Sequence, residues 1–173
     1  SKDKKIILHI GELVWYNMVE ELINSVPTWP ENYILVLHGW GQKDYLNYLK
    51  QLAEKNGLYN KRIFISTEIL PQEDLDKMVS SADIGVALYH NVDLNFYYMA
   101  SGKLFHYLKC GLPAIATDFP NLKKVVEENC CGICIHDEDE IADAIKEILN
   151  LIKNYRRNRI KKILEKLVRF GIK

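Results

Sequence analysis

The feature that most constrains the fold is a regular alternation of short apolar runs with segments of helical character. The apolar runs are rich in β-branched residues and cover residues 5–10, 33–38, 62–66, 82–88, 113–117 and 131–135. Strands that are apolar on both sides are typical of parallel sheets whose two faces are covered by helices. The alternation therefore predicts an α/β domain with a doubly wound, parallel, six-stranded sheet of the Rossmann-like type.

Helices are predicted between these strands. They are expected over residues 16–25, 44–57, 71–81, 101–111, 121–128 and 137–149, followed by a terminal helix over 154–170. Asp44 and Ser101 are expected to cap two of them. Residues 89–99 form a loop long enough to carry function. Ligands of such sheets bind beyond the carboxyl ends of the strands, and we expect the functional site there.

The composition is that of a single globular domain spanning residues 1–173. Of these residues, 48% are hydrophobic and 27% are charged, a balance that excludes a disordered chain and a disulfide scaffold. No apolar run approaches the ~20 residues needed to span a bilayer. Because the sequence begins at Ser1 with neither an initiator Met nor a signal peptide, we expect an excised domain of a longer protein.

The cysteines are interpreted as reduced core residues of a cytoplasmic protein. They are Cys110, Cys130, Cys131 and Cys134, and the last two have C-x-x-C spacing. A second such pair is missing, and no His follows at zinc-finger distance. A metal or redox role is therefore the less favoured alternative.

The most informative stretch for chemistry is residues 99–113, MASGKLFHYLKCGLP. Ser101, Gly102 and Lys103 open a helix directly after the long loop, at the carboxyl end of a strand. Free N–H groups at such a helix start, with no side-chain bulk at Gly102, form a site suited to phosphate. Lys103 in the first turn is unfavourable for the helix dipole unless an anion is bound. The alternative is that Ser101 only caps the helix and Lys103 is a solvated surface charge.

The run KLFHYLKCGLPAIATD, residues 103–118, resembles the signature of retaining glycosyltransferases of the family 4 type. Other segments are similar to the family in the same order: residues 10–11, 39–41, 81–86, 129–133 and 139–145. The resemblance covers nearly the whole chain. It implies the C-terminal, nucleotide-sugar-binding domain of a GT-B enzyme, whose N-terminal acceptor domain is expected to lie outside this sequence.

By position, the resemblance assigns a donor site to particular residues. The residues at the diphosphate would be Ser101, Gly102 and Lys103, and those at the ribose or nucleotide would be His106 and Tyr98. The backbone around the donor would be that of Gly11, Gly39, Gly41, Thr67, Glu68 and Ile69, with residues 67–70 along the base. No catalytic residue is assigned within this chain. Neither a metal ion nor another cofactor is implied.

The sequence departs from the family pattern in the same region. Two family glutamates, eight positions apart, are Tyr98 and His106 here, and the family's Gly-Arg after the first strand is Gly11-Glu12. A carboxylate facing a diphosphate repels it, so Glu12 either points away or marks a changed site. These departures leave a second hypothesis, a non-catalytic domain with a degenerate donor site that binds a partner. A sugar-nucleotide epimerase or phosphorylase is a third and less favoured one.

The function implied by the resemblance is transfer of a sugar from a nucleoside diphosphate sugar to a hydroxyl acceptor, in polysaccharide or glycoconjugate biosynthesis. The enzyme is expected in the cytoplasm, and this chain alone is expected to be inactive. The chain has no net charge, but residues 153–173 hold nine basic residues and one acidic residue. The basic terminal helix expected over 154–170 has three interpretations. It packs on the N-terminal domain, it lies on the inner face of an anionic membrane, or it is an amphipathic helix whose polar face is basic. Overall charge gives no argument for nucleic-acid binding.

Overall fold

The computed structural model describes residues 4–148, so the expected terminal helix and the basic segment 153–173 lie outside the described residues. The strands are β1 (Lys5–Glu12), β2 (Tyr33–Trp40), β3 (Ile63–Ser66), β4 (Ile84–Ala87), β5 (Ala114–Thr117) and β6 (Gly132–Ile135). Every pairing is parallel, and the strand order is β3-β2-β1-β4-β5-β6. The predicted doubly wound, six-stranded parallel sheet is confirmed.

The connections between the strands are helical. The helices are α1 (Val19–Ser25), α2 (Lys43–Lys55), α3 (Gln72–Ser81), α4 (Leu94–Tyr97), α5 (Gly102–Lys109) and α6 (Pro120–Asn129), and residues 141–148 are also helical. The short helix α4 lies within the long loop expected over residues 89–99. No helix within residues 4–148 has the length and apolar character needed to cross a membrane.

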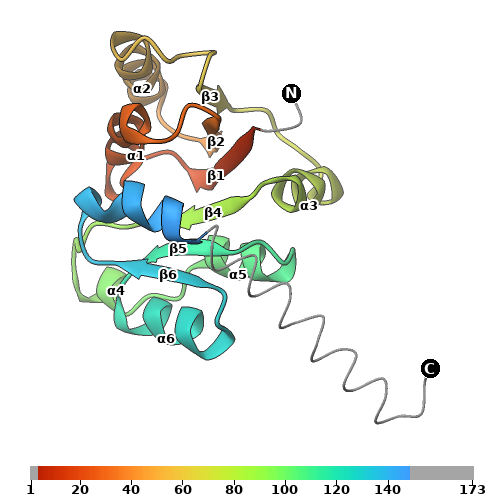
Figure 1. Ribbon diagram of the computed structural model, residues 1–173, viewed down its shortest axis with the longest axis vertical. Helices are drawn as coiled ribbons and strands as arrows, with labels where there is room; N and C mark the ends of the chain where they lie inside the picture. Colours follow the sequence, from red (N-terminus) through yellow and green to blue (C-terminus); the bar gives the residue numbers. More distant parts are fainter. Residues whose placement is uncertain (1–3, 149–173) are drawn as a thin grey trace.

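Helices cover both faces of the sheet, and each face has its own core. α1, α2 and the helix over 141–148 pack on one face through side chains such as Leu22, Leu49 and Ile145. α3, α5 and α6 pack on the other face through side chains that include Val79 and Tyr107. Figure 1 shows α3 and α5 across the sheet from α1 and α2. Right-handed crossovers produce this division because the strand order reverses between β1 and β4.

The helix starts agree with the sequence only in part. Ser101 caps α5 as expected, because its Oγ accepts a hydrogen bond from the Leu104 N–H at 3.2 Å. Asp44 does not cap α2: the N-cap is Gln42, and Asp44 lies in the first turn, where a carboxylate favours the helix dipole. The first helix begins later than predicted because the chain takes a left-handed conformation at Met18, with φ of 51°.

Tyr107 of α5 fills the gap that opens between β1 and β4. The pairing of these strands ends at Leu8, whereas β1 continues to pair with β2 as far as Glu12. The Tyr107 side chain is fully buried, and its hydroxyl accepts a hydrogen bond from the Ile10 N–H at 3.1 Å. The hydroxyl proton has two carbonyl acceptors within reach, Leu8 at 3.2 Å and Val86 at 3.1 Å. One side chain therefore ties α5 to both strands.

Replacing Tyr107 by Phe is expected to lower the free energy of unfolding by about 1–3 kcal/mol, because the buried Ile10 N–H loses its partner. Urea unfolding followed by circular dichroism measures the loss. Tyr48→Phe is the matched control, since the Tyr48 hydroxyl donates a hydrogen bond to Glu20 on the surface. The control should change stability by less than about 0.5 kcal/mol. Equal losses in the two variants would contradict the role given to Tyr107.

Candidate functional site

A cavity of about 620 Å³ lies at the carboxyl ends of β1 and β2, beside the start of α5. The strand order reverses between β1 and β4 at this edge, the position at which doubly wound sheets bind ligands. The predicted site residues that line the cavity are Gly11, Gly39, Thr67, Glu68, Ile69, Gly102, Lys103 and His106. The fold thus brings together most of the predicted site, while ligand binding by these residues stays a prediction.

Three predicted site residues do not line the cavity. The Ser101 hydroxyl is buried and lies 2.6 Å from the Tyr89 hydroxyl while it caps α5, so its hydrogen bonds are made within the protein. Tyr98 follows α4, is 56% exposed and is not part of the cavity wall. Gly41 lies just beyond β2, where a Cβ would come within 2.5 Å of the Leu13 carbonyl oxygen. The structure therefore gives Ser101 and Gly41 structural roles.

Gly11 and Gly39 also have structural reasons to be glycine. Gly11 has φ of +102°, a conformation that L side chains rarely adopt. A Cβ on Gly39 would collide with the carbonyl group of Gly11 on the neighbouring strand. A Cβ on Gly11 would lie 3.9 Å from Lys103 Cε, so the glycine also leaves space beside that side chain. The two glycines allow the strand ends to form a close-packed wall of the cavity.

Lys103 brings a cation into the cavity wall from the first turn of α5. Its Nζ lies 3.5 Å from Nε2 of His9 and 4.8 Å from the centre of the Tyr89 ring. Burial lowers the pKa of Lys103 to about 7, and the Glu12 carboxylate opposes that shift. Among residues 4–148, no carboxylate forms an ion pair with this ammonium. Lys103 is therefore a cation placed to meet an anion that enters the cavity.

No motif in the sequence marks His9, a polar residue inside the apolar run of β1. Its side chain is fully buried, with Nε2 3.4 Å from the Glu12 carbonyl oxygen. Nδ1 has no hydrogen-bond partner in the part of the chain that the structure describes. Burial, followed by the charge of Lys103, lowers the pKa of His9 well below its ordinary value. His9 is thus neutral at physiological pH and adds no second positive charge beside the ammonium.

The sequence left two alternatives for Glu12, a side chain that points away from the site or a changed site. Glu12 lies on the cavity wall, which favours a changed site. The side chain is exposed, and its carboxylate accepts a hydrogen bond from the Tyr16 hydroxyl at 2.9 Å. Its negative charge favours the ammonium form of Lys103. The same charge repels an anion that approaches the cavity.

The first turn of α5 supplies further groups that can bind an anion. The first backbone hydrogen bond of the helix runs from the Phe105 N–H to the Ser101 carbonyl oxygen at 3.1 Å, and the Leu104 N–H is capped. The N–H groups of Gly102 and Lys103 precede both bonds and remain free for a ligand. Because both residues line the cavity, the positive end of the helix dipole lies at its wall.

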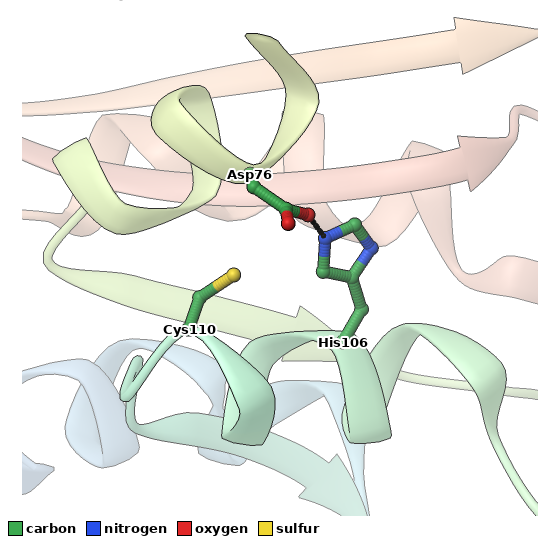
Figure 2. A group of neighbouring side chains, drawn as sticks. All are labelled: Asp76, His106 and Cys110. Atoms are coloured by element: carbon green, nitrogen blue, oxygen red, sulfur yellow. Dashed lines mark hydrogen bonds and ion pairs between the residues drawn. The ribbon is translucent and has the colours of Figure 1, made fainter. Parts of the chain in front are cut away.

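His106 lies one turn further along α5 and also lines the cavity, but one of its ring nitrogens is occupied (Figure 2). Nε2 is 2.7 Å from Oδ1 of Asp76 on α3. Hydrogen bonds from Lys109, Gln72 and His106 lower the pKa of Asp76 to about 2. Since Asp76 is ionised, Nε2 of His106 donates this hydrogen bond, and in the corresponding neutral tautomer Nδ1 is an acceptor.

Asp76 does not line the cavity, but it is the partner of His106 that sequence reasoning missed. It precedes His106 by 30 residues, and only the shared core of α3 and α5 brings the two together. No local motif could have revealed the contact. The contact also matters for variants, because Glu at position 106, as in the family pattern, would set a second carboxylate against Asp76.

The cysteines are all free thiols, and only one of them is a core residue. Cys131 is buried as expected, but Cys130 is exposed, and Cys110 and Cys134 are partly buried. Burial raises the pKa of Cys131 to about 11 and that of Cys134 to about 12. Both thiols of the C-x-x-C pair therefore stay protonated at neutral pH, which disfavours a redox role.

Lys103→Met is expected to raise the free energy of unfolding, because an apolar side chain replaces a partly buried ammonium. The pKa of Lys103 is about 7 in the folded chain against an ordinary value of 10.5, so the unfolded chain binds more protons between these values. The free energy of unfolding of the wild type therefore rises from pH 7 to 10.5. The stability advantage of Lys103→Met over the wild type decreases over the same range. Urea unfolding at pH 6 should show a gain of about 1 kcal/mol or more. A gain of equal size at pH 9 would contradict the buried charge.

Comparison with known proteins identifies relatives of this chain. The family model described as Glycosyl transferases group 1 matches residues 1–166. The chitobiosyldiphosphodolichol beta-mannosyltransferase of Dictyostelium discoideum is 29% identical over 136 residues, which are 76% of this chain and 25% of that protein. An uncharacterized glycosyltransferase of Methanocaldococcus jannaschii is 26% identical over 150 residues, which are 86% of this chain and 36% of that protein. This chain thus spans well under half the length of either relative.

Solved structures share the fold. HepE of Anabaena, in complex with UDP, superposes with a TM-score of 0.72 and 17% identity, over 86% of this chain and 40% of that one. The C-terminal domain of LpcC, a glycosyl transferase group 1 family protein of Francisella tularensis, has a TM-score of 0.66 and 17% identity, over 84% of this chain and 75% of that one. With the family model matching residues 1–166, this chain belongs to the group 1 glycosyl transferases.

Proposed function

We propose that this chain is the donor-binding domain of an enzyme that transfers a sugar from a nucleoside diphosphate sugar to a hydroxyl acceptor. The observation that carries the proposal is Lys103, whose ammonium lies without a carboxylate partner beside the free N–H groups of α5. These groups line a cavity at the strand ends where such sheets bind ligands. Family membership and the UDP bound to HepE of Anabaena support the proposal.

The diphosphate would lie against the first turn of α5. There it would accept hydrogen bonds from the N–H groups of Gly102 and Lys103 and contact the Lys103 ammonium. Preorganised donors of this kind stabilise the charge that develops on a departing diphosphate. Because the helix terminus and the ammonium already supply positive charge, these contacts require no metal ion. Ser101 contributes the cap that holds the turn, and its hydroxyl is not one of the donors.

The nucleoside would lie on the remaining wall of the cavity. Residues 67–70 would follow the base, mainly through their backbone, and His106 would accept a hydrogen bond from a ribose hydroxyl through Nδ1. Trp40 also lines the cavity and is 65% exposed, so its ring is available for stacking. The cavity volume, about 620 Å³, falls within the range of roughly 300–1,000 Å³ that small-molecule sites occupy.

The remainder of the reaction would belong to a longer protein. This chain covers 25% and 36% of the two curated relatives, so the proposal places the acceptor site on an additional N-terminal domain. The chain alone would bind nucleotide and catalyse no transfer. We further propose a role in polysaccharide or glycoconjugate assembly in the cytoplasm.

A non-catalytic, partner-binding domain is the second candidate, and Glu12 is the observation that favours it. Its carboxylate stands on the cavity wall, where the family pattern has an Arg, and repels a diphosphate. The second candidate is the weaker one. Lys103, the free N–H groups of α5 and the cavity itself are all in place.

Isothermal titration calorimetry of the 173-residue chain with UDP, GDP and ADP is expected to show that one of the three binds. Lys103→Met should weaken this binding about 10-fold or more, since a hydrogen bond to a charged group contributes roughly 1.5–3 kcal/mol. Lys124→Met is the control, because Lys124 is an exposed residue of α6 outside the cavity wall. Binding of none of the three nucleotides to a chain shown to be folded would favour the non-catalytic domain.

The affinity for that nucleotide is expected to fall as the pH rises from 7.5 to 9. The pKa of Lys103 is about 7 in the free chain, and a bound diphosphate raises it, so binding takes up a proton in this range. The loss is at most about tenfold per pH unit. Lys103→Arg stays charged and should bind with little dependence on pH. A flat profile in the wild type would show that the Lys103 ammonium does not contact the diphosphate.

A further inference from the structure

A second cluster of side chains, which shares His106 with the cavity wall, lies towards the carboxyl end of α5 (Figure 2). It consists of Asp76 from α3 together with His106 and Cys110 from α5 and its C-cap. A carboxylate oxygen, an imidazole nitrogen and Sγ all lie within 4.8 Å of one another, and all three residues are partly buried. We propose that these three side chains bind a transition-metal cation, and that Zn²⁺ is the ion they fit best.

The arrangement follows from the helix geometry and from core packing. His106 and Cys110 are four positions apart, so they lie on the same side of α5. Figure 2 shows the Sγ of Cys110 and one ring nitrogen of His106 turned toward the Asp76 carboxylate. Among residues 4–148, no other set of three potential ligands comes this close together.

The distances require only small side-chain movements. With Zn–N and Zn–O bonds of about 2.0–2.2 Å and a Zn–S bond of about 2.3 Å, tetrahedral ligand atoms stand about 3.3–3.6 Å apart. The Asp76 Oδ1 to His106 Nε2 contact is 2.7 Å, so it has to open by about 0.6–0.9 Å. Separations of up to 4.8 Å have to close by about 1.2–1.5 Å, which rotation of the Cys110 and Asp76 side chains can supply.

The charges suit a divalent cation. An ionised Asp76 and a Cys110 thiolate together neutralise Zn²⁺, while thiolate and imidazole ligands select zinc over magnesium or calcium. Lys109 Nζ lies 2.8 Å from Oδ2 of Asp76, the oxygen that the cation does not need. Lys109 can therefore hold the ligating carboxylate in place, as outer partners of metal ligands do. The negative end of the α5 dipole at Cys110 favours a cation as well.

Metal binding would change what His106 presents to its surroundings. The cation takes the lone pair of Nε2, so the ring proton moves to Nδ1, and the thiol proton of Cys110 is released to solvent. Nδ1 then becomes a hydrogen-bond donor instead of an acceptor. Three protein ligands leave a fourth position on Zn²⁺ for a water molecule. The cluster stands apart from the first turn of α5, and its existence does not depend on the proposed donor site.

Cobalt titration of the metal-free, reduced 173-residue chain tests the site. We expect one equivalent of Co²⁺ to bind with a thiolate-to-cobalt charge-transfer band, and one equivalent of Zn²⁺ to displace it. Cys110→Ala should abolish the band, and Asp76→Asn should weaken Zn²⁺ binding about 10-fold or more. Cys130→Ala is the matched control, because Cys130 is an exposed cysteine outside the cluster. The control should keep both the band and the affinity.

Thermal unfolding separates loss of metal from loss of fold. Metal-free Asp76→Asn and Cys110→Ala must unfold cooperatively, and Cys110→Ser replaces the latter if it does not. Zn²⁺ should raise the melting temperature of the wild type and of Cys130→Ala but not that of the cluster variants. Absence of one-to-one Co²⁺ binding to the wild type, or a charge-transfer band that persists without the Cys110 thiol, overturns the proposal. Neither readout involves nucleotide, so this result and the nucleotide titrations stand or fall separately.

Discussion

The hydrogen bonds of Tyr107 hold together the part of the sheet on which the cavity depends. Parallel strands that separate leave backbone N–H and C=O groups without partners, and β1 separates from β4 beyond Leu8. The Tyr107 hydroxyl meets this need, because it accepts from the Ile10 N–H and can donate to the Val86 carbonyl oxygen. The same helix presents Lys103 one turn earlier. The bonds that close the sheet therefore also fix the position of the anion-binding turn.

A cation inside a cavity is costly to keep charged when no anion is bound. Here Lys103 is partly buried beside a neutral His9, and its pKa of about 7 allows it to lose its proton when no anion is bound. Glu12 acts in the other direction, because its carboxylate favours the charged form of Lys103. In the proposed donor site, these effects balance two needs: a low cost of burial without ligand, and an ammonium available to a diphosphate.

The sheet and the helix start could be predicted because their signals are local. A run of apolar β-branched residues marks a strand, and Ser101 followed by a free first turn marks the start of α5. Contacts between distant segments carry no such signal. The hydrogen bond from His106 to Asp76 depends on how α3 and α5 pack together. The need for glycine at position 85 of β4 depends on how α5 packs on the sheet, because a Cβ there would lie 2.6 Å from the Tyr107 ring. Sequence reasoning therefore found the cavity's location and its cation, but not the groups that set the ionisation of that cation or the carboxylate that orients His106.

The contact with Asp76 changes how the departure at position 106 is understood. A family glutamate would offer carboxylate oxygens to the donor, whereas His106 offers only Nδ1. The hydrogen bond from Nε2 to an ionised Asp76, 2.7 Å long, orients the ring and leaves Nδ1 as the acceptor. The negative charge that Glu would carry at position 106 is thus carried by Asp76, which lies one hydrogen bond farther from the cavity. Glu12 has no such compensation, because it adds negative charge where the family pattern is positive. In the proposed donor site, the attraction for a diphosphate therefore rests on Lys103 and the free N–H groups of α5.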